Sequence, residues 1–169
     1  DPLLAGKMGA AITRGAQSIG VSVCVKHYTT NNQENGRYVN DSRISNRALR
    51  EIYLKPFEIA LKAKPWTVMC SYNPINGVYA SENKKMLADV LRKRLGFDGL
   101  VMSDWGAVHN GYKAVRAGLD LRMPHDDESF AVLKDAYEKG YLTIEQIDES
   151  VSRVLALAEK VSSTKKHAQ

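Results

Sequence analysis

The apolar residues of this chain follow two alternating spacings over its first 160 positions. Short apolar runs rich in β-branched residues are typical of buried strands, and between them apolar residues recur at the three- or four-residue spacing of helices with one buried face. Pro56 lies inside one predicted helix and should kink it. The predicted strands are residues 21–25, 67–71, 99–103 and 119–123, and the predicted helices are residues 3–19, 46–64, 83–95, 108–117, 130–137 and 143–160.

Strands that alternate with helices at short intervals predict parallel βα units and therefore the α/β fold class. The strands are continuous apolar runs, as expected when helices or a second layer cover both faces of the sheet. Two architectures fit this pattern: a small doubly wound sheet, or about half of a (β/α)8 barrel with four strands. A complete barrel takes roughly 250 residues, and this chain has 169. The periodicity by itself leaves both architectures open.

Polar or ionisable residues follow each predicted strand. In α/β folds of either kind, ligands bind outside the carboxyl ends of the strands, so these side chains should converge on one point. The alternative is that they are ordinary strand-to-loop transitions, which are polar in any case. The residues are Lys26 and His27, then Tyr72 and Asn73, then Asp104, and finally Asp120 or the residues just after Met123.

Asp104 and Trp105 form the most informative pair. Asp104 follows an apolar strand, so its carboxylate emerges from buried surroundings at the rim of the sheet. Such a group can serve as a nucleophile, a general base or a metal ligand, and it can also cap the helix predicted at 108–117. The indole of Trp105 offers a flat apolar surface that suits a sugar ring.

Charge, motifs and cysteine content argue against several classes of ligand and site. The net charge is +5, but Lys160, Lys165 and Lys166 supply three of these charges, which argues against a basic nucleic-acid-binding face. We expect residues 161–169 to form a basic tail without fixed structure. No metal-binding or phosphate-binding motif occurs, so no cofactor or metal is expected. Cys24 and Cys70 are too few for a disulfide scaffold, and two buried, free thiols slightly favour a cytoplasmic location.

Five segments together resemble family 3 glycoside hydrolases, in their β-glucosidase branch. Residues 25–37 (VKHYTTNNQENGR) resemble the Lys-His loop of that family, and residues 47–57 (RALREIYLKPF) the helix that follows it. Residues 68–77 (VMCSYNPING) resemble the next strand and loop. Residues 96–105 (GFDGLVMSDW) are similar to the family's nucleophile signature, and residues 117–124 (AGLDLRMP) to the strand after it.

The resemblance implies that residues 1–160 form the later half of a (β/α)8 catalytic domain and that Asp104 is the nucleophile. Arg122 stands where the family often has an acid, and His125 where a glycine is common. The family's acid/base residue, its early barrel strands and its second α/β domain have no counterpart in this chain. By the same resemblance, with Trp105 added for its indole, the sugar subsite would be lined by Lys26, His27, Arg37, Tyr72, Trp105 and Met123.

Our first hypothesis is therefore a fragment of a retaining β-glycosidase. It would act on terminal non-reducing β-linked sugars by double displacement. It would be inactive alone, because no residue of this chain is a persuasive second carboxyl group, and Glu34 is the only loop acid to test for that role. An alternative is a non-catalytic carbohydrate-binding or half-barrel module that assembles with another chain. A third is an unrelated barrel enzyme with Asp104 as general base. Open sheet edges would also favour self-association.

Overall fold

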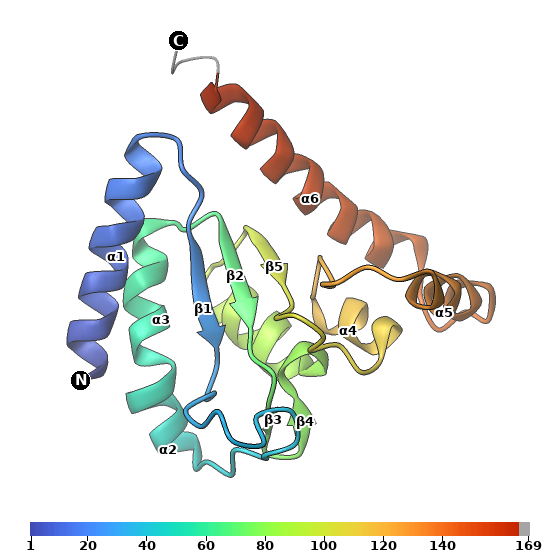
Figure 1. The fold of residues 1–169 in the computed structure, drawn as a ribbon, viewed down its shortest axis with the longest axis horizontal. Coiled ribbons are helices and arrows are strands. Elements are labelled where there is room, and N and C mark those ends of the chain that lie inside the picture. Colours follow the sequence, from blue (N-terminus) through green and yellow to red (C-terminus); the bar gives the residue numbers. More distant parts are fainter. Residues whose placement is uncertain (166–169) are drawn as a thin grey trace.

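A small parallel sheet, with most of its helices packed on one face, organises the chain (Figure 1). The computed structural model describes residues 1–165. The sheet has the order β1-β2-β5, so the second strand lies in the middle and the other two form its edges. A separate antiparallel hairpin follows β2. The strands are β1 (Cys24–Tyr28), β2 (Thr67–Cys70), β3 (Pro74–Ile75), β4 (Val78–Tyr79) and β5 (Leu100–Met102).

The helices alternate with these strands, as the sequence predicts. Pro56 lies in the first turn of α3, where its missing N–H costs nothing, so the helix predicted at 46–64 is broken just before it. The helical segments are α1 (Pro2–Ser18), α2 (Asn46–Ala48), the π-helical η1 (Leu49–Tyr53), α3 (Lys55–Ala60), the 3₁₀ turns η2 (Leu61–Ala63) and η3 (Ala80–Glu82), the π-helical η4 (Lys85–Arg94), α4 (Gly111–Ala117), α5 (Asp127–Glu138) and α6 (Ile144–Lys165).

The hydrophobic core lies between one face of the sheet and the helices. Val68 and Val101 are fully buried there, against apolar side chains of α3, η4 and α4. Met69 and Met102 are register partners on the opposite face and are only half-buried, and Leu121 beside them is exposed. Within the described residues this second face is therefore partly open, although the sequence predicted cover on both faces.

The fourth predicted strand is not a regular strand. Residues 119–123 contact β5 through a single parallel bridge between Met102 and Leu121. The reason lies at Asp120, whose side chain accepts a hydrogen bond from the Val101 N–H at 2.8 Å. The Asp120 carboxylate thus takes the Val101 N–H, which in a longer ladder would donate to a backbone carbonyl group of the fourth strand.

Asp120 is the centre of a buried ion network rather than part of a convergent site. Its carboxylate, which is inaccessible to solvent, accepts from Arg92 Nη2 at 2.6 Å and from Arg153 Nη1 at 2.9 Å. Arg92 also donates to the carbonyl groups of Gly99 and Gly118. The network ties η4, β5 and α6 together. Asp120, one of the two alternatives that the sequence offered at the fourth strand end, therefore does not face the site, and Arg92 on η4 is mostly buried in this network.

The long loop at residues 29–45 is anchored to the β3–β4 hairpin. Asn76 and Gly77 form the turn with φ angles of 50° and 88°, the left-handed pair that a tight hairpin requires. The Asn76 side chain also exchanges two hydrogen bonds with the backbone of Ile44. The Gly77 N–H donates to Asp41. The loop is therefore an ordered platform beside the carboxyl ends of β1 and β2.

The last helix begins as predicted and extends further than predicted. Thr143 and Gln146 form the capping box, in which each backbone N–H donates to the other residue's side chain. The helix continues to Lys165, so residues 161–165 are helical and the predicted tail boundary was wrong; residues 166–169 lie outside the described residues. Among the described helices, none is both long and apolar enough to span a bilayer.

The two cysteines are free, as predicted, but their surroundings differ. Cys70 is fully buried in the core and is the register partner of Tyr28. Cys24 is the register partner of Thr67 and is only half-buried, on the partly open face, with its Sγ 3.9 Å from Met102 Sδ. The expectation that both thiols are buried was therefore wrong for Cys24.

Candidate active site

Asp104 and His27 meet at the carboxyl ends of two strands. His27 lies near the end of β1, joined to Lys26 by a cis peptide bond, and Asp104 follows β5. His27 Nε2 is 3.1 Å from Asp104 Oδ2, although the two strands are separated by β2. Asp104 Oδ1 accepts a hydrogen bond from the Trp105 N–H at 2.7 Å. Each carboxylate oxygen thus has a polar neighbour, and 15% of the side chain is exposed.

Asp104 does not cap the helix after it. Helix α4 begins later than predicted, and its N-cap is Asn110, whose side chain accepts from the Lys113 N–H. The backbone carbonyl of Asp104 accepts from Ala107 in a turn of its own. The carboxylate is therefore left free of the capping role that the sequence alone allowed for it.

The loop that carries Asp104 is held against Met123, at the end of the fourth predicted strand. Ser103 is fully buried, and its hydroxyl accepts from the Met123 N–H at 2.9 Å. The Met123 carbonyl in turn accepts from the Gly106 N–H at 2.8 Å. These bonds lie on either side of Asp104 in the chain, so they fix the backbone that presents its carboxylate. Met123 is half-buried at this point.

Tyr72 and Arg37 form a layered arrangement beside Asp104. The Arg37 guanidinium lies 4.3 Å from the centre of the Tyr72 ring, a cation–π distance, and the Tyr38 ring lies 4.6 Å from the Tyr72 ring. Burial raises the pKa of the Tyr72 hydroxyl, and hydrogen bonding to Asp104 and Tyr38 raises it further. Tyr72 is therefore a neutral hydrogen-bond donor at neutral pH. Tyr38 contributes to this arrangement, although no sequence pattern distinguishes it from its loop neighbours.

The surroundings of the His27 imidazole favour its neutral form. Partial burial lowers the pKa of the imidazole, the positive charges of Lys26 and Arg37 lower it too, and the carboxylates of Asp104 and Glu34 partly offset this. The lowered pKa favours the neutral imidazole, whose Nε2 lies 3.1 Å from Oδ2 of Asp104.

The other predicted residues surround this cluster at different distances from its centre. Lys26 is exposed, and no ion pair forms at its ammonium group among residues 1–165. Trp105 is 64% exposed, so its indole faces open space. Glu34 pairs with Arg37 at 2.6 Å. Asn73 is not in the cluster: it is buried and donates to Thr30, Ser42 and Pro74 in the loop platform.

The two departures from the family pattern lie elsewhere. Arg122 donates to Asp126 at 2.9 Å and to Ser129, and so braces the first turn of α5. His125 is an exposed neighbour of Asp127. Neither side chain contacts Asp104 in the described structure. Within residues 1–165, no three His, Cys, Asp or Glu side chains are grouped as a metal ion would require.

Comparison with known protein families places this geometry in context. Residues 1–157 match the model of the glycosyl hydrolase family 3 N terminal domain. The chain belongs to glycoside hydrolase family 3. It is 48% identical over 164 residues to an exo-α-(1→6)-L-arabinopyranosidase of Bifidobacterium longum, covering 95% of this chain and 21% of that enzyme. It is 47% identical over 169 residues to β-glucosidase B of Emericella nidulans, covering 96% of this chain and 20% of that one.

Solved structures of the family share this fold. β-Glucosidase 3B of Thermotoga neapolitana, solved with glycerol, superimposes with a TM-score of 0.93 at 43% identity, over 98% of this chain and 24% of that one. The β-glucosidase of Kluyveromyces marxianus, solved with glucose, gives 0.94 at 36% identity, over 98% and 20%. The chain spans about a fifth of the length of the curated relatives it matches. Both its sequence and its fold therefore place the chain in this family.

Proposed function

We propose that Asp104 is the nucleophile of a retaining β-glycosidase and that this chain holds the nucleophile part of the active site. The observation that carries the proposal is the position of its carboxylate, at the carboxyl end of β5 and 3.1 Å from His27 on a strand two places away. In parallel α/β folds, substrates bind at the carboxyl ends of the strands.

The geometry suits a double displacement. One oxygen of Asp104 would attack the anomeric carbon and form an ester bond, while an acid gives its proton to the departing glycosidic oxygen. Water would then cleave the ester and release the sugar with its original configuration. The Trp105 N–H holds one carboxylate oxygen in place. His27 lies 3.1 Å from the other, and its lowered pKa favours the neutral form, so it adds no positive charge that would weaken the attack.

The neighbouring side chains suit recognition of a sugar. Hydroxyl groups need donors and acceptors at several angles, and an apolar ring face needs a flat surface. Lysine, imidazole, guanidinium and phenol groups supply the first, and the exposed indole and thioether supply the second. We assign these roles to Lys26, His27, Arg37, Tyr72, Trp105 and Met123. Because several relatives are named β-glucosidases, we propose a β-glucoside, cleaved at its terminal non-reducing end, as the substrate.

We propose further that residues 1–160 are the later half of a barrel domain. The free edge of β1 and the partly open face around Met69 and Met102 fit a sheet that continues into strands outside this chain. On this view the early strands, the acid/base and a second α/β domain lie outside these residues. The isolated chain then has one carboxyl group where the mechanism needs two about 5–5.5 Å apart, and it is inactive.

A chimera tests the nucleophile. The segment of Thermotoga neapolitana β-glucosidase 3B that matches these 169 residues is replaced by this chain, and hydrolysis of a nitrophenyl β-glucoside is measured. Asp104→Ala should abolish turnover, and added azide should restore part of it by forming the glycosyl azide. Asp98→Ala, an exposed acid just before the same strand, is the matched control and should leave turnover unchanged. Turnover of Asp104→Ala near that of the control refutes the assignment.

The isolated chain tests its incompleteness. We expect no hydrolysis of the same substrate above that of an Asp104→Asn blank, because general acid assistance alone is worth roughly 10²–10⁴-fold in rate. Clear activity that the substitution removes would show that a second carboxyl group, with Glu34 the first to examine, completes the site within this chain.

A further inference from the structure

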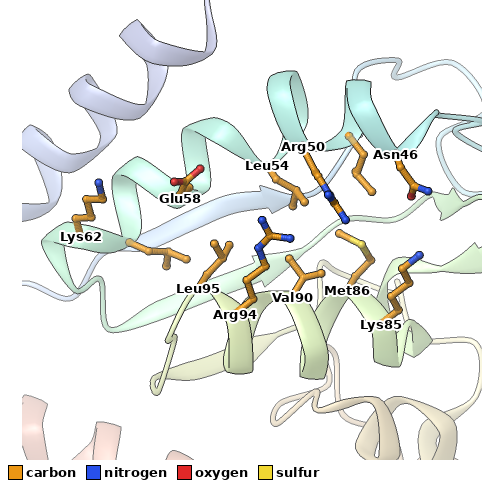
Figure 2. Close-up of a pocket in the computed structure, with 12 residues that line it drawn as sticks. Asn46, Arg50, Leu54, Glu58, Lys62, Lys85, Met86, Val90, Arg94 and Leu95 are labelled. Atoms are coloured by element: carbon orange, nitrogen blue, oxygen red, sulfur yellow. The ribbon is translucent and has the colours of Figure 1, made fainter.

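A cavity lies in the helical layer, outside the Asp104 cluster. It has a volume of about 380 Å³ and opens between the segment formed by α2, η1 and α3 on one side and η4 on the other (Figure 2). Pockets for small organic ligands have volumes of roughly 300–1,000 Å³. None of its lining residues belongs to the set that we assign to the sugar site, so the glycosidase mechanism does not explain it.

Positive charge gathers at this cavity from both sides. Arg50 on η1 and Arg94 on η4 extend toward one another across it, and Lys62 and Lys85 stand at its two ends (Figure 2). Across residues 1–165, none of these four cations takes part in an ion pair. The one acid in the lining, Glu58, pairs with Lys55 at 3.2 Å. Two guanidinium groups therefore face each other without a protein anion between them.

Like charges on facing helices repel, and the repulsion is relieved when an anion lies between them. The paired N–H donors of a guanidinium group match the oxygens of a carboxylate or phosphate. An anion between two arginines is therefore bound both by charge attraction and by well-oriented hydrogen bonds. This pair of guanidinium groups suits an anionic ligand.

Below the cations the cavity is apolar. Leu54 and Met86 are buried, and Val90 and Leu95 are half-buried and pack against the core. An inorganic ion would leave this surface in contact with water, whereas a ligand with an apolar body would cover it and gain roughly 25 cal/mol for each Å² removed from water. We propose that the cavity binds a small organic anion with an apolar body, with its carboxylate between Arg50 and Arg94 and its body on the Leu54–Met86 floor.

Calorimetric titration of the purified chain with naphthalene-2-carboxylate tests this. Naphthalene-2-carboxamide is the neutral probe of the same shape. Arg50→Gln and Arg94→Gln each remove one charge from the cavity, and both side chains are exposed, so the fold should survive, as circular dichroism will check. Arg14→Gln removes the same charge from an exposed position on α1 that does not line this cavity, and it is the matched control.

We expect the carboxylate to bind at one site and the amide at least about tenfold more weakly, since hydrogen bonds to a charged group are typically worth about one power of ten or more in affinity. Each cavity variant should weaken carboxylate binding by about the same factor, and Arg14→Gln should not change it. Equal affinity for the two probes, equal affinity of the cavity and control variants, or no saturable binding of the carboxylate each overturns the proposal.

Discussion

Asp120→Asn probes the buried ion network that holds η4, β5 and α6 together. The substitution keeps the shape of the side chain but removes its charge, and it places an NH₂ group where a carboxylate oxygen accepted from a guanidinium. Arg92 then loses its 2.6 Å partner and Arg153 its 2.9 Å partner. Burial already lowers the pKa of Arg92, and Asp120 is the main group that offsets this.

The expected cost follows from the burial of the network. The Asp120 side chain is fully buried, and the side chains of Arg92 and Arg153 are 13% and 22% exposed. Removal of one partner from a buried ion pair typically destabilises a protein by about 3–5 kcal/mol, because the remaining charge stays buried without compensation. With a urea dependence of about 2 kcal/mol per molar, the midpoint of unfolding should fall by roughly 1.5 M or more.

Equilibrium urea unfolding followed by circular dichroism measures this loss. Asp89→Asn is the control, because Asp89 pairs with Lys93 on the exposed side of η4. It should change the free energy of unfolding by less than about 1 kcal/mol, as solvent-exposed pairs do. If Asp120→Asn also costs less than about 1 kcal/mol, the network does not hold these elements together and the reasoning is wrong.

Three further predictions concern single residues. Gly77→Ala should lower the unfolding free energy by about 1 kcal/mol, because φ is 88° at this position. Gly15→Ala, inside α1 with open space around it, should instead raise the unfolding free energy by up to about 1 kcal/mol. The same sign for both would contradict the assigned turn. Burial raises the pKa of Cys70 to about 12, so a thiol reagent at mildly alkaline pH should label the half-buried Cys24 first, and a Cys24→Ser variant should react far more slowly than the parent. His27 should titrate by NMR with a midpoint below 6.5. Because its folded-state pKa is lowered, its contribution to stability is complete above pH 6.5 and declines as the pH falls toward the folded-state pKa. A midpoint above 6.5 would reverse this sign.

Local patterns predicted the elements well where one segment alone determines its structure. The apolar runs at 67–71 and 99–103 are β2 and β5, and the Asn76-Gly77 pair is a hairpin turn. The capping box at Thr143 marks where α6 begins, because it depends only on residues three positions apart.

The failures concern partners that are distant in the chain. Asp120 and Arg92 have the ordinary appearance of a strand end and a basic helix face, and only the approach of α6 with Arg153 makes them a buried network. The fourth predicted strand has the right apolar residues, but Asp120 takes the Val101 N–H that a longer ladder would share.

Part of the candidate site was predictable for a different reason. Rules for α/β folds placed His27, Tyr72 and Asp104 at the same edge of the sheet, and the structure brings these three together. The same rule also selected Asn73, which turns into the loop platform instead. Tyr38 was missed because the order of the loop at 29–45, which brings its ring to Tyr72, depends on the separate hairpin.

Covalent trapping tests the central claim most directly. The chimera described above is treated with a 2-deoxy-2-fluoro-β-glucosyl fluoride, which slows breakdown of a glycosyl ester, and is then digested and analysed by mass spectrometry. The account predicts that the fluorosugar is attached to Asp104, in the peptide that contains GFDGLVMSDW, and that Asp104→Ala carries no label. A label on any other residue of this chain, or an equal label in the Asp104→Ala variant, would contradict it.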